Sequence, residues 1–462
     1  MKPLSIEEIV NAIGGKVIQK GNTAKITGVS TDTRTIQPGS LFIPLVGERF
    51  DGHKFIDIAV QNGAAAIITQ DPEITISDSV HIIYTRSTLD ALQRLAAWYL
   101  KSFNIPVVAI TGSTGKTTTK DMVYSVLSEK FNVLKTQGNF NNEIGLPLTL
   151  FNLNTQHQIV VLEMGMSGFG EIRRLIGIAP PKVAVISNIG VSHIEKLGSR
   201  ENILKAKMEI FEGFNNGCTA IINDDNDLLH QVGNLPFQVI KFGTEQTADY
   251  RAEDIDLMGE AGIKYTIRLD EKTYPITLKV PGRHNIYNSL TAIAIGRIFG
   301  MDMAEIQKGL LSFESGKMRL NIFTVNPNIK VIDDVYNASP DSVNAALKIL
   351  QDMDGDRKIA ILGDMLELGE YSSNAHKQVG KMVVSCKTDI LITKGKDSEW
   401  IDEGAISAGM PAGSIIHLQN NKEVIERLNT VLSSGDRILV KGSRGMHMEE
   451  IVGYLKNGRV PK

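Results

Sequence analysis

Cysteine is scarce in this chain, which has two among its 462 residues, Cys218 and Cys386. Two cysteines so far apart in the sequence do not make the framework of disulfides that stabilises small secreted domains. Such low cysteine usage is typical of proteins from a reducing compartment such as the cytosol. We therefore expect a cytoplasmic protein.

Long apolar runs and an excess of charge of one sign are also missing. No stretch is long and apolar enough to span a bilayer, and the first ten residues, with Glu7 and Glu8, indicate an amphipathic helix instead of a signal peptide. The net charge is −3 and the isoelectric point is about 6.3, without a long basic block. Neither nucleic acid nor membrane insertion is therefore indicated.

What the chain does contain is a glycine loop between a predicted strand and a predicted helix. The apolar run at 105–110 leads directly into Thr111-Gly-Ser-Thr-Gly-Lys-Thr-Thr118, and the residues from Thr119 to Glu129 have the apolar spacing of a helix with one buried face. Glycines let backbone N–H groups turn toward an anion, and a helix N-terminus adds partial positive charge. This arrangement predicts a site for the phosphates of ATP or GTP.

Roles within this loop follow from its chemistry. Lys116 can reach the β- and γ-phosphates, and the Thr117 hydroxyl can ligate Mg²⁺. The loop is a contracted form of the common pattern, because Ile110 stands where that pattern has its first glycine. A chance glycine turn is the alternative, which the flanking strand and helix disfavour. The expected nucleotide contacts are Gly112, Ser113, Thr114, Gly115, Lys116, Thr117 and Thr118.

The residue pattern divides the chain into three expected domains, which fits its length. Residues 1–104 mix short strands, turns and two helical stretches, which predicts a small mixed α/β domain. Residues 105–316 alternate apolar runs with helices, as in a parallel sheet, with an antiparallel insertion at 244–273. Residues 317–462 repeat this alternation and predict a Rossmann-like α/β domain. Ser315-Gly-Lys317 is the expected hinge.

Polar residues follow several predicted strands of the central part, where the ligands of open α/β sheets gather. Glu163 ends the strand at 159–162 and can hold Mg²⁺; capping of the next turn is the alternative. His193 follows the strand at 183–186 and is either a ligand or a structural histidine. Asn288 begins a later helix and can hydrogen-bond a purine edge. Lys205 and Lys207 lie in a helical segment, where a solvated face is the ordinary interpretation.

Charged residues stand at predicted strand ends in the third part as well. Arg319 follows the expected hinge, where an arginine can stabilise phosphoryl-transfer charge. A lysine or arginine at such a place can also hold a substrate carboxylate. The remaining candidates for substrate or nucleotide contact follow the strands at 331–332 and 438–440: Asp334, Tyr336, Asn337, Lys441 and Arg444.

The first part has turns crowded with hydroxyl groups and backbone donors. Ser30, Asp32 and Arg34 lie in Ser30-Thr-Asp-Thr-Arg34, and the loop at 47–55 is similar in character. Such turns suit a polar ligand such as a nucleotide-sugar. A turn-rich small domain explains the pattern almost equally well.

The order of these motifs resembles the Mur ligases, ATP-dependent amide-bond ligases of peptidoglycan precursor synthesis. The resemblance covers essentially the whole chain. Within the family, four segments are similar to the member that adds the terminal dipeptide, although Ser339 stands where that member more often has asparagine. The motifs shared with the family lie at 111–118, 163–165, 188–193, 206–211 and 282–288, and the four segments at 139–147, 333–340, 362–369 with His376, and 440–444.

This resemblance implies ATP and two Mg²⁺ ions, with Lys116 on the β- and γ-phosphates and Thr117 on a metal. Glu163 and His193 would complete the metal coordination. Lys207 matches the family's carbamylated lysine, and its carbamate would help to bind the second Mg²⁺, which reverses the interpretation as a solvated lysine. The remaining implied contacts are Asn288 to adenine, Arg319 to the γ-phosphate, Asp334 to the nucleotide, Asn141 and Asn142 to the muramoyl-peptide, and Ser30, Asp32 and Arg34 to the UDP-sugar.

The implied reaction joins D-Ala-D-Ala to UDP-MurNAc-tripeptide through an acyl phosphate, and we expect a monomer. A sister ligase that adds the third peptide residue and a folylpolyglutamate-type ligase are the alternatives within the class. The missing Asp-Asn-Pro-Arg stretch and the UDP-type first domain count against both. A regulatory ATPase on the same fold is the alternative outside it. The base for the attacking amine is left open, with His376 as one candidate.

Overall fold

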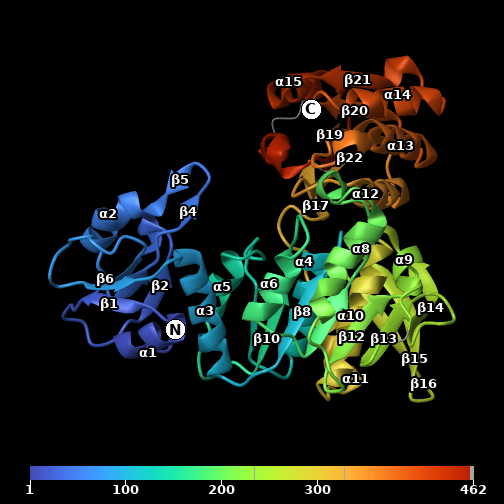
Figure 1. Ribbon diagram of the computed structural model, residues 1–462. Coiled ribbons are helices and arrows are strands. Elements are labelled where there is room, and N and C mark those ends of the chain that lie inside the picture. Colours follow the sequence, from blue (N-terminus) through green and yellow to red (C-terminus); the bar gives the residue numbers. More distant parts are fainter. Residues whose placement is uncertain (234, 327, 458–462) are drawn as a thin grey trace.

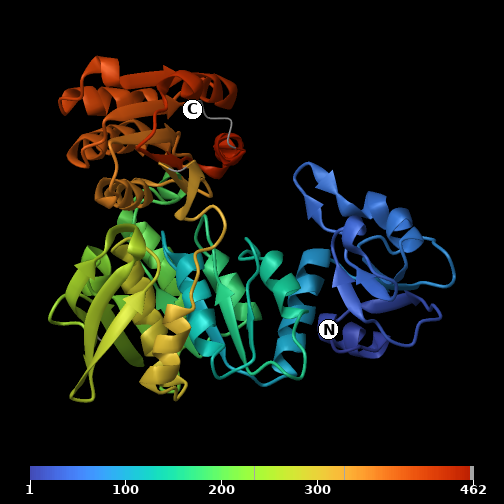
Figure 2. The ribbon, with the colours of Figure 1, turned by 180° about the vertical axis from the view of Figure 1, so that it is seen from behind.

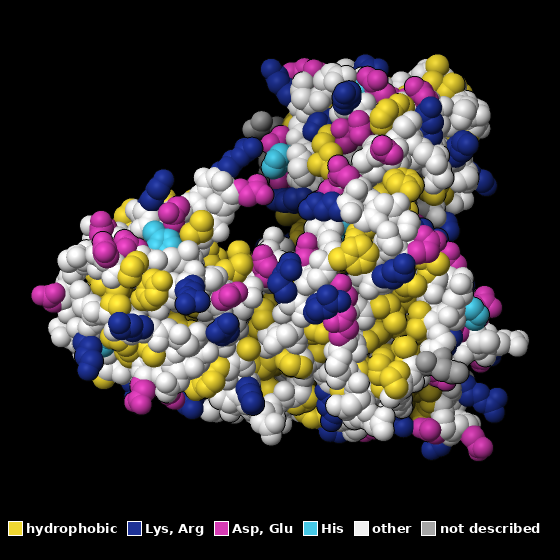
Figure 3. All heavy atoms as spheres, viewed as in Figure 1, with side chains coloured by type: hydrophobic (Ala, Val, Ile, Leu, Met, Phe, Trp, Pro, Cys, Tyr) yellow, Lys and Arg dark blue, Asp and Glu magenta, His cyan; other side chains and the backbone are white. Residues whose placement is uncertain are grey.

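The computed structural model describes residues 1–233, 235–326 and 328–457. They form three lobes, each built on its own β-sheet (Figure 1). The amino-terminal and carboxyl-terminal lobes both adjoin the central lobe, and the view from behind shows the same arrangement (Figure 2). The space-filling view shows a hollow between the two outer lobes (Figure 3). The predicted α/β fold class is therefore confirmed. No helix in the described ranges is long and apolar enough to cross a membrane.

The amino-terminal lobe has a mixed five-stranded sheet in which only the β1–β7 pair is antiparallel. The predicted amphipathic helix is α1, which begins after a capping box formed by Ser5 and Glu8. In spatial order the strands are β1 (Lys16–Gln19), β7 (His81–Tyr84), β6 (Ala64–Thr69), β3 (Ser40–Phe42) and β2 (Gly28–Ser30). The other elements are α1 (Ile6–Ile13), α2 (Ile56–Gln61), α3 (Thr88–Lys101) and the hairpin β4 (Val46–Gly47) and β5 (Phe50–Asp51).

Helix α3 fastens this lobe to the central one. Tyr99 is fully buried, and its hydroxyl donates to the Leu153 carbonyl at 2.8 Å and accepts from the Lys2 N–H at 2.6 Å. The Gln93 amide adds a bond to the Glu143 carbonyl at 3.2 Å. The position of the first lobe is thus fixed by packing and hydrogen bonds along one helix.

The central lobe has a nine-stranded sheet that is parallel from β9 to β14 and antiparallel across β14, β15 and β16, as predicted for the insertion. The strands in spatial order are β16 (Lys272–Leu278), β15 (Ile263–Leu269), β14 (Tyr250–Leu257), β13 (Gln238–Gly243), β12 (Thr219–Asn223), β11 (Val183–Ile186), β8 (Val107–Thr111), β10 (Ile159–Glu163) and β9 (Val133–Lys135). The helices are α4 (Lys116–Leu127), α5 (Gly145–Leu150), α6 (Glu171–Ile178), α7 (Ile194–Leu197), α8 (Arg200–Met208), α9 (Asp227–His230), α10 (His284–Ile298) and α11 (Met303–Leu311).

Both faces of this sheet are covered, which is why its strands are apolar without alternation. Along β8, Val108 and Ile110 belong to the core beneath α4, α10 and α11, whereas Ala109 belongs to the core on the side of α5, α6 and α8. Helix α4 begins at Lys116, three residues before the predicted start. Gly115 in the left-handed region, with φ of 80°, turns the chain directly into the helix.

The carboxyl-terminal lobe is a second wound α/β sheet of six strands, parallel except for the edge strand β17. Residues 312–320 connect it to the central lobe without a regular element. The strands in spatial order are β17 (Asn321–Asn326), β18 (Ile329–Asp334), β22 (Asp436–Lys441), β19 (Arg357–Gly363), β20 (Ile390–Lys394) and β21 (Ile415–Leu418). The helices are α12 (Pro340–Asp352), α13 (Ser372–Ser385), α14 (Glu399–Ser407), α15 (Asn421–Val431) and α16 (Glu449–Lys456).

Candidate active site

One cavity of about 890 Å³ lies where strand ends of the central and carboxyl-terminal lobes face each other. Most of the residues singled out from the sequence line it. From the central lobe these are Ser113, Thr114, Gly115, Lys116, Thr117, Thr118, Asn141, Asn142, Glu163, His193 and Asn288. From the carboxyl-terminal lobe they are Arg319, Asp334, Tyr336, Asn337 and Lys441.

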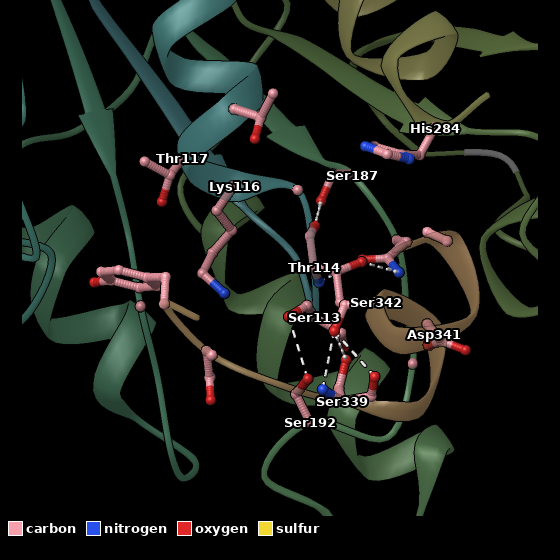
Figure 4. Close-up of a pocket in the computed structure, with 18 of the residues that line it drawn as sticks. Ser113, Thr114, Lys116, Thr117, Ser187, Ser192, His284, Ser339, Asp341 and Ser342 are labelled. Atoms are coloured by element: carbon pink, nitrogen blue, oxygen red, sulfur yellow. Dashed lines mark hydrogen bonds between the residues drawn. The ribbon is translucent and has the colours of Figure 1, made fainter. Parts of the chain in front are cut away.

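Residues of the segment that follows β11 form hydrogen bonds with the glycine loop at 112–115 (Figure 4). Asn188 accepts the Thr114 N–H through its side-chain oxygen at 2.8 Å and donates to the Thr114 hydroxyl at 2.9 Å. Ser187 Oγ donates to the Thr114 carbonyl at 2.6 Å, and Ser192 Oγ donates to the Ser113 carbonyl at 3.2 Å. The loop is therefore a preformed concave structure.

The polar groups of this loop suit an anion. The Ser113 hydroxyl is buried in the cavity wall without a hydrogen-bond partner among the described residues. Lys116 donates to the Gly112 carbonyl at 2.8 Å, and burial lowers its pKa, an effect that the Glu163 carboxylate opposes. A phosphate oxygen would satisfy the hydroxyl and favour the charged form of the lysine.

Gly112 carries a testable consequence of this close packing. A Cβ atom there would lie 1.9 Å from Ser187 Oγ. Gly112→Ala is expected to displace Ser187, to break its bond to the loop and to destabilise the fold by about 1–3 kcal/mol, as overpacking does. Urea unfolding and ATP affinity measure the effect. Gly177→Ala is the matched control, because nothing lies within 4 Å of that position in α6 and alanine favours a helix. Equal stability and ATP affinity in both variants would contradict the expectation.

Glu163 joins the loop to the neighbouring strand end. Its two carboxylate oxygens accept from Thr117 Oγ1 and from the Asn141 side-chain amide, each at 2.8 Å, although the side chain is only 3% exposed. A hydroxyl and a carboxylate are hard oxygen donors, which Mg²⁺ prefers together with phosphate oxygens and water. Within the described ranges no three His, Cys, Asp or Glu side chains gather to hold a metal by themselves. The donor set thus fits a metal that arrives with a phosphate ligand.

Lys207 and Lys205 differ in burial. Lys207 in α8 is 1% exposed, whereas Lys205 faces solvent. Burial, together with the positive charge of Lys116, lowers the pKa of Lys207 well below its usual range. Among the described residues no hydrogen bond or ion pair of its amine is found. The interpretation as a solvated lysine therefore holds for Lys205 and fails for Lys207.

The carboxyl-terminal lobe contributes positive charge to the opposite wall. The Arg319 guanidinium lies 3.8 Å from the centre of the Tyr336 ring, a cation–π contact. Lys441 is 2% exposed and pairs with the Asp334 carboxylate at 2.5 Å, and it also donates to the Asn337 carbonyl at 2.8 Å. These contacts place the side chains across the cavity from the glycine loop.

Asn288 and His284 come from the start of α10. The Asn288 side-chain oxygen accepts from Thr119 Oγ1 at 2.8 Å, and its amide donates to Asn285 at 2.9 Å, so its orientation is fixed by the protein. Burial lowers the pKa of His284 to about 4; the charge of Asp334 opposes this shift, and the charge of Lys441 adds to it. The imidazole on the cavity wall is therefore neutral and offers a flat surface on which a purine base could pack.

Some predicted residues lie away from this cavity. Ser30, Asp32 and Arg34 lie in the first lobe, where Arg34 pairs with Asp32 at 2.6 Å and is 87% exposed. Arg444 pairs with Glu449 at 3.1 Å instead of lining the cavity.

His376 is not available as a base. It is fully buried, accepts the Met365 N–H through Nε2 at 3.0 Å and contacts the Ser372 carbonyl through Nδ1 at 2.7 Å. Its role is structural, because both ring nitrogens are used within the lobe.

Sequence reasoning missed several residues of the wall, among them Ser187, Ser192 and Asp341. Asp341 begins α12 and approaches the central lobe so closely that a Cβ at Gly190 would lie 2.3 Å from its carboxylate. Burial raises the pKa of this carboxyl group. Ser187 directly precedes the recognised Asn188-to-His193 segment and Ser192 lies within it, so the polar residues after this strand were the available signal. No local signal marks Asp341, because its contact crosses between lobes.

Models of one family match most of the chain. Residues 110–296 match the Mur ligase middle domain, residues 318–444 the Mur ligase, glutamate ligase domain, and residues 25–100 the Mur ligase family, catalytic domain. UDP-N-acetylmuramoyl-tripeptide–D-alanyl-D-alanine ligase of Bacillus subtilis (strain 168) is 41% identical over 428 residues, which is 92% of either chain.

Solved structures agree with this result. A crystal structure of MurF from Acinetobacter baumannii superimposes with a TM-score of 0.91 at 30% identity and covers 99% of both chains. MurF ligase from Thermotoga maritima in complex with ADP gives a TM-score of 0.82 at 30% identity, over 93% of this chain and 97% of that one. Sequence, fold and cavity lead to the same conclusion: this chain belongs to the Mur ligase family.

Proposed function

We propose that the protein is an ATP-dependent ligase that joins D-Ala-D-Ala to UDP-MurNAc-tripeptide and forms UDP-MurNAc-pentapeptide for peptidoglycan synthesis. The observation that carries this proposal is the single cavity in which a phosphate loop, the Glu163 carboxylate and the cationic wall with Arg319 and Lys441 face one another. The named activity of the Bacillus subtilis relative supplies the two substrates. The ADP in the Thermotoga maritima structure supports the choice of nucleotide.

The glycine loop would hold the β- and γ-phosphates of ATP, with Lys116 as the cation closest to them. Asn288 would face the adenine, Asp334 the nucleotide, and Arg319 the γ-phosphate. Thr117, Glu163 and His193 would hold one Mg²⁺ ion, and the carbamate of Lys207 would help to hold a second. Bound there, such ions would neutralise phosphate charge and polarise the γ-phosphoryl group.

The amine of Lys207 is suited to carbamylation. Only a neutral amine attacks CO₂, and burial without a partner carboxylate favours the neutral form. The C–N bond forms, a proton leaves, and the side chain becomes an anion. A carbamate beside Lys116 would exchange the repulsion between two cations for attraction.

In the first step the terminal carboxylate of the tripeptide attacks the γ-phosphorus of ATP, the bond to the β-phosphate oxygen breaks, and an acyl phosphate and ADP result. Both reactants are anions, so Lys116 and Arg319 lower the barrier by compensating charge that gathers in the transition state. Asn141 and Asn142, on the same wall as Glu163, would orient the muramoyl-peptide.

In the second step the neutral amine of D-Ala-D-Ala attacks the acyl carbon. A tetrahedral intermediate forms and collapses, and phosphate leaves with the electron pair of the C–O bond. The amine must lie within about 3–3.5 Å of that carbon, and closure of the lobes over the substrates would keep water from the acyl phosphate. Tyr336, Asn337 and Lys441, which line the cavity, are the proposed contacts of the incoming dipeptide, and Ser30, Asp32 and Arg34 those of the UDP-sugar.

Phosphate release is the direct test. Protein, ATP, Mg²⁺ and UDP-MurNAc-tripeptide are combined with D-Ala-D-Ala, or with meso-diaminopimelate, L-lysine or glutamate in its place. Release only with D-Ala-D-Ala is expected. Release with another acceptor would identify a sister ligase, and ADP formation without any amide product would identify a regulatory ATPase.

Three further features belong to the same proposal. The domains are divided at 1–104, 105–316 and 317–462, the protein acts as a monomer, and it works in the cytoplasm. Support for the last point comes from Cys218 and Cys386, which are both free thiols, as in a reducing compartment.

A further inference from the structure

A loop of the carboxyl-terminal lobe reaches across the cavity rim and contacts the central lobe next to the glycine loop. Glu367 Oε2 lies 2.6 Å from His193 Nδ1. The Tyr371 hydroxyl donates to the Gly198 carbonyl at 2.8 Å. Gly369 packs so closely on Glu195 that a Cβ there would lie 2.9 Å from its side chain. The segment 366–371 is therefore docked on the start and the end of α7.

Both members of the closest contact have an uncommon backbone conformation. His193 has φ of 64° and Glu367 has φ of 65°, in the left-handed region. This region is uncommon for residues other than glycine, and such a conformation persists only where the surrounding structure enforces it. Two such residues meet here across a lobe interface, which indicates that the contact is specified by the fold.

The loop that carries Glu367 is rigidly anchored in its own lobe. The Met365 N–H donates to His376 Nε2 at 3.0 Å, and the Leu366 N–H donates to Ser443 Oγ at 2.9 Å. Ser443 in turn donates its N–H to the Asp364 carbonyl at 3.1 Å. The backbone that leads into Glu367 is thus anchored to the body of the carboxyl-terminal lobe.

The contact with Glu367 determines which nitrogen of the His193 ring carries the hydrogen. A carboxylate only accepts hydrogen bonds, so Nδ1 of His193 carries the hydrogen, and in the neutral ring Nε2 keeps its lone pair. Histidines that ligate metals almost always donate their other nitrogen to a carboxylate or carbonyl, which fixes the ring and raises its basicity. His193 lines the cavity and has such a partner, and the partner comes from a different lobe.

We propose that Glu367 is a positioning residue, which orients His193 from across the lobe interface so that the imidazole ligates the nucleotide-bound metal only while the carboxyl-terminal lobe is docked. The inference rests on the proposed function through the role of His193 alone. Metal affinity and the position of the carboxyl-terminal lobe are then linked, because the metal is bound more tightly when that lobe is docked.

Metal binding without turnover tests this link. The protein is mixed with less than one equivalent of β,γ-methylene-ATP and titrated with Mn²⁺, and the EPR signal of free Mn²⁺ reports binding. Glu367→Ala is expected to weaken Mn²⁺ binding about 10- to 100-fold, the range for loss of such a partner. Tyr371→Phe removes only the docking bond to Gly198 and is expected to have a smaller effect of the same sign.

Glu370→Gln is the matched control, since Glu370 is a neighbouring exposed carboxylate outside the catalytic machinery. Wild-type Mn²⁺ affinity in Glu367→Ala, or an equal loss in Glu370→Gln, would overturn the proposal. Should the alanine variant not fold, Glu367→Gln retains the shape of the side chain and must still weaken binding. The assay contains neither peptide substrate, so its outcome is independent of whether D-Ala-D-Ala is the acceptor.

Discussion

Replacing Lys116 by alanine is expected to lower kcat/KM about 10²–10³-fold, the range for loss of one electrostatic group that acts on the transition state. Lys116 begins α4 at the end of the glycine loop and is held by the Gly112 carbonyl at 2.8 Å. Burial lowers its pKa in the protein without nucleotide, so the γ-phosphate and the lysine stabilise each other as a pair.

Steady-state ADP formation at varied ATP concentration measures the effect, with urea unfolding as a check on folding. Lys101→Ala, at the exposed end of α3, is the matched control and should behave as wild type. The expected pattern is a large fall in kcat. If only the KM for ATP rose, Lys116 would bind ground state and transition state equally, and its proposed role in phosphoryl transfer would be wrong.

The parts of the fold that could be predicted are those set by local pattern. The buried strands β8, β10 and β11 are continuous apolar runs, and the glycine loop is recognised by residues that must accept positive φ or approach an anion closely. Glu163 was found because it ends a strand beside that loop. Each of these features depends on neighbours in sequence or on the common edge of one parallel sheet.

The rest depends on contacts between residues far apart in the chain. The distinction between Lys205 and Lys207 is decided by which side of α8 faces the sheet, and two alternate lysines in a short helix give a weak pattern. The pair formed by Glu367 and His193 joins two lobes, and nothing in either segment indicates the other. His376 was a candidate base, yet both of its ring nitrogens are used inside the lobe, Nε2 by the Met365 N–H and Nδ1 by the Ser372 carbonyl.

Replacing Lys207 by alanine is expected to lower kcat about 10²-fold or more. The amine is buried, lies in the field of Lys116 and has no partner among the described residues, so a charged lysine would be unfavourable here. A carbamate resolves this conflict, because it places an anion where a cation is repelled. Removal of the side chain would therefore remove a metal ligand, and because it also deletes a buried aliphatic stem, urea unfolding is measured beside activity.

Two measurements separate this role from a structural one. With ¹³C-labelled bicarbonate, the carbamate carbonyl should give an NMR signal in the wild type and in Lys205→Ala that is lost in Lys207→Ala. Activity should follow the same order, because Lys205 is solvated on the same helix. Equal and mild losses of activity in both variants would reject the carbamate, and so would an unchanged signal in Lys207→Ala. A lost signal with full activity would mean that the carbamate forms but takes no part in phosphoryl transfer.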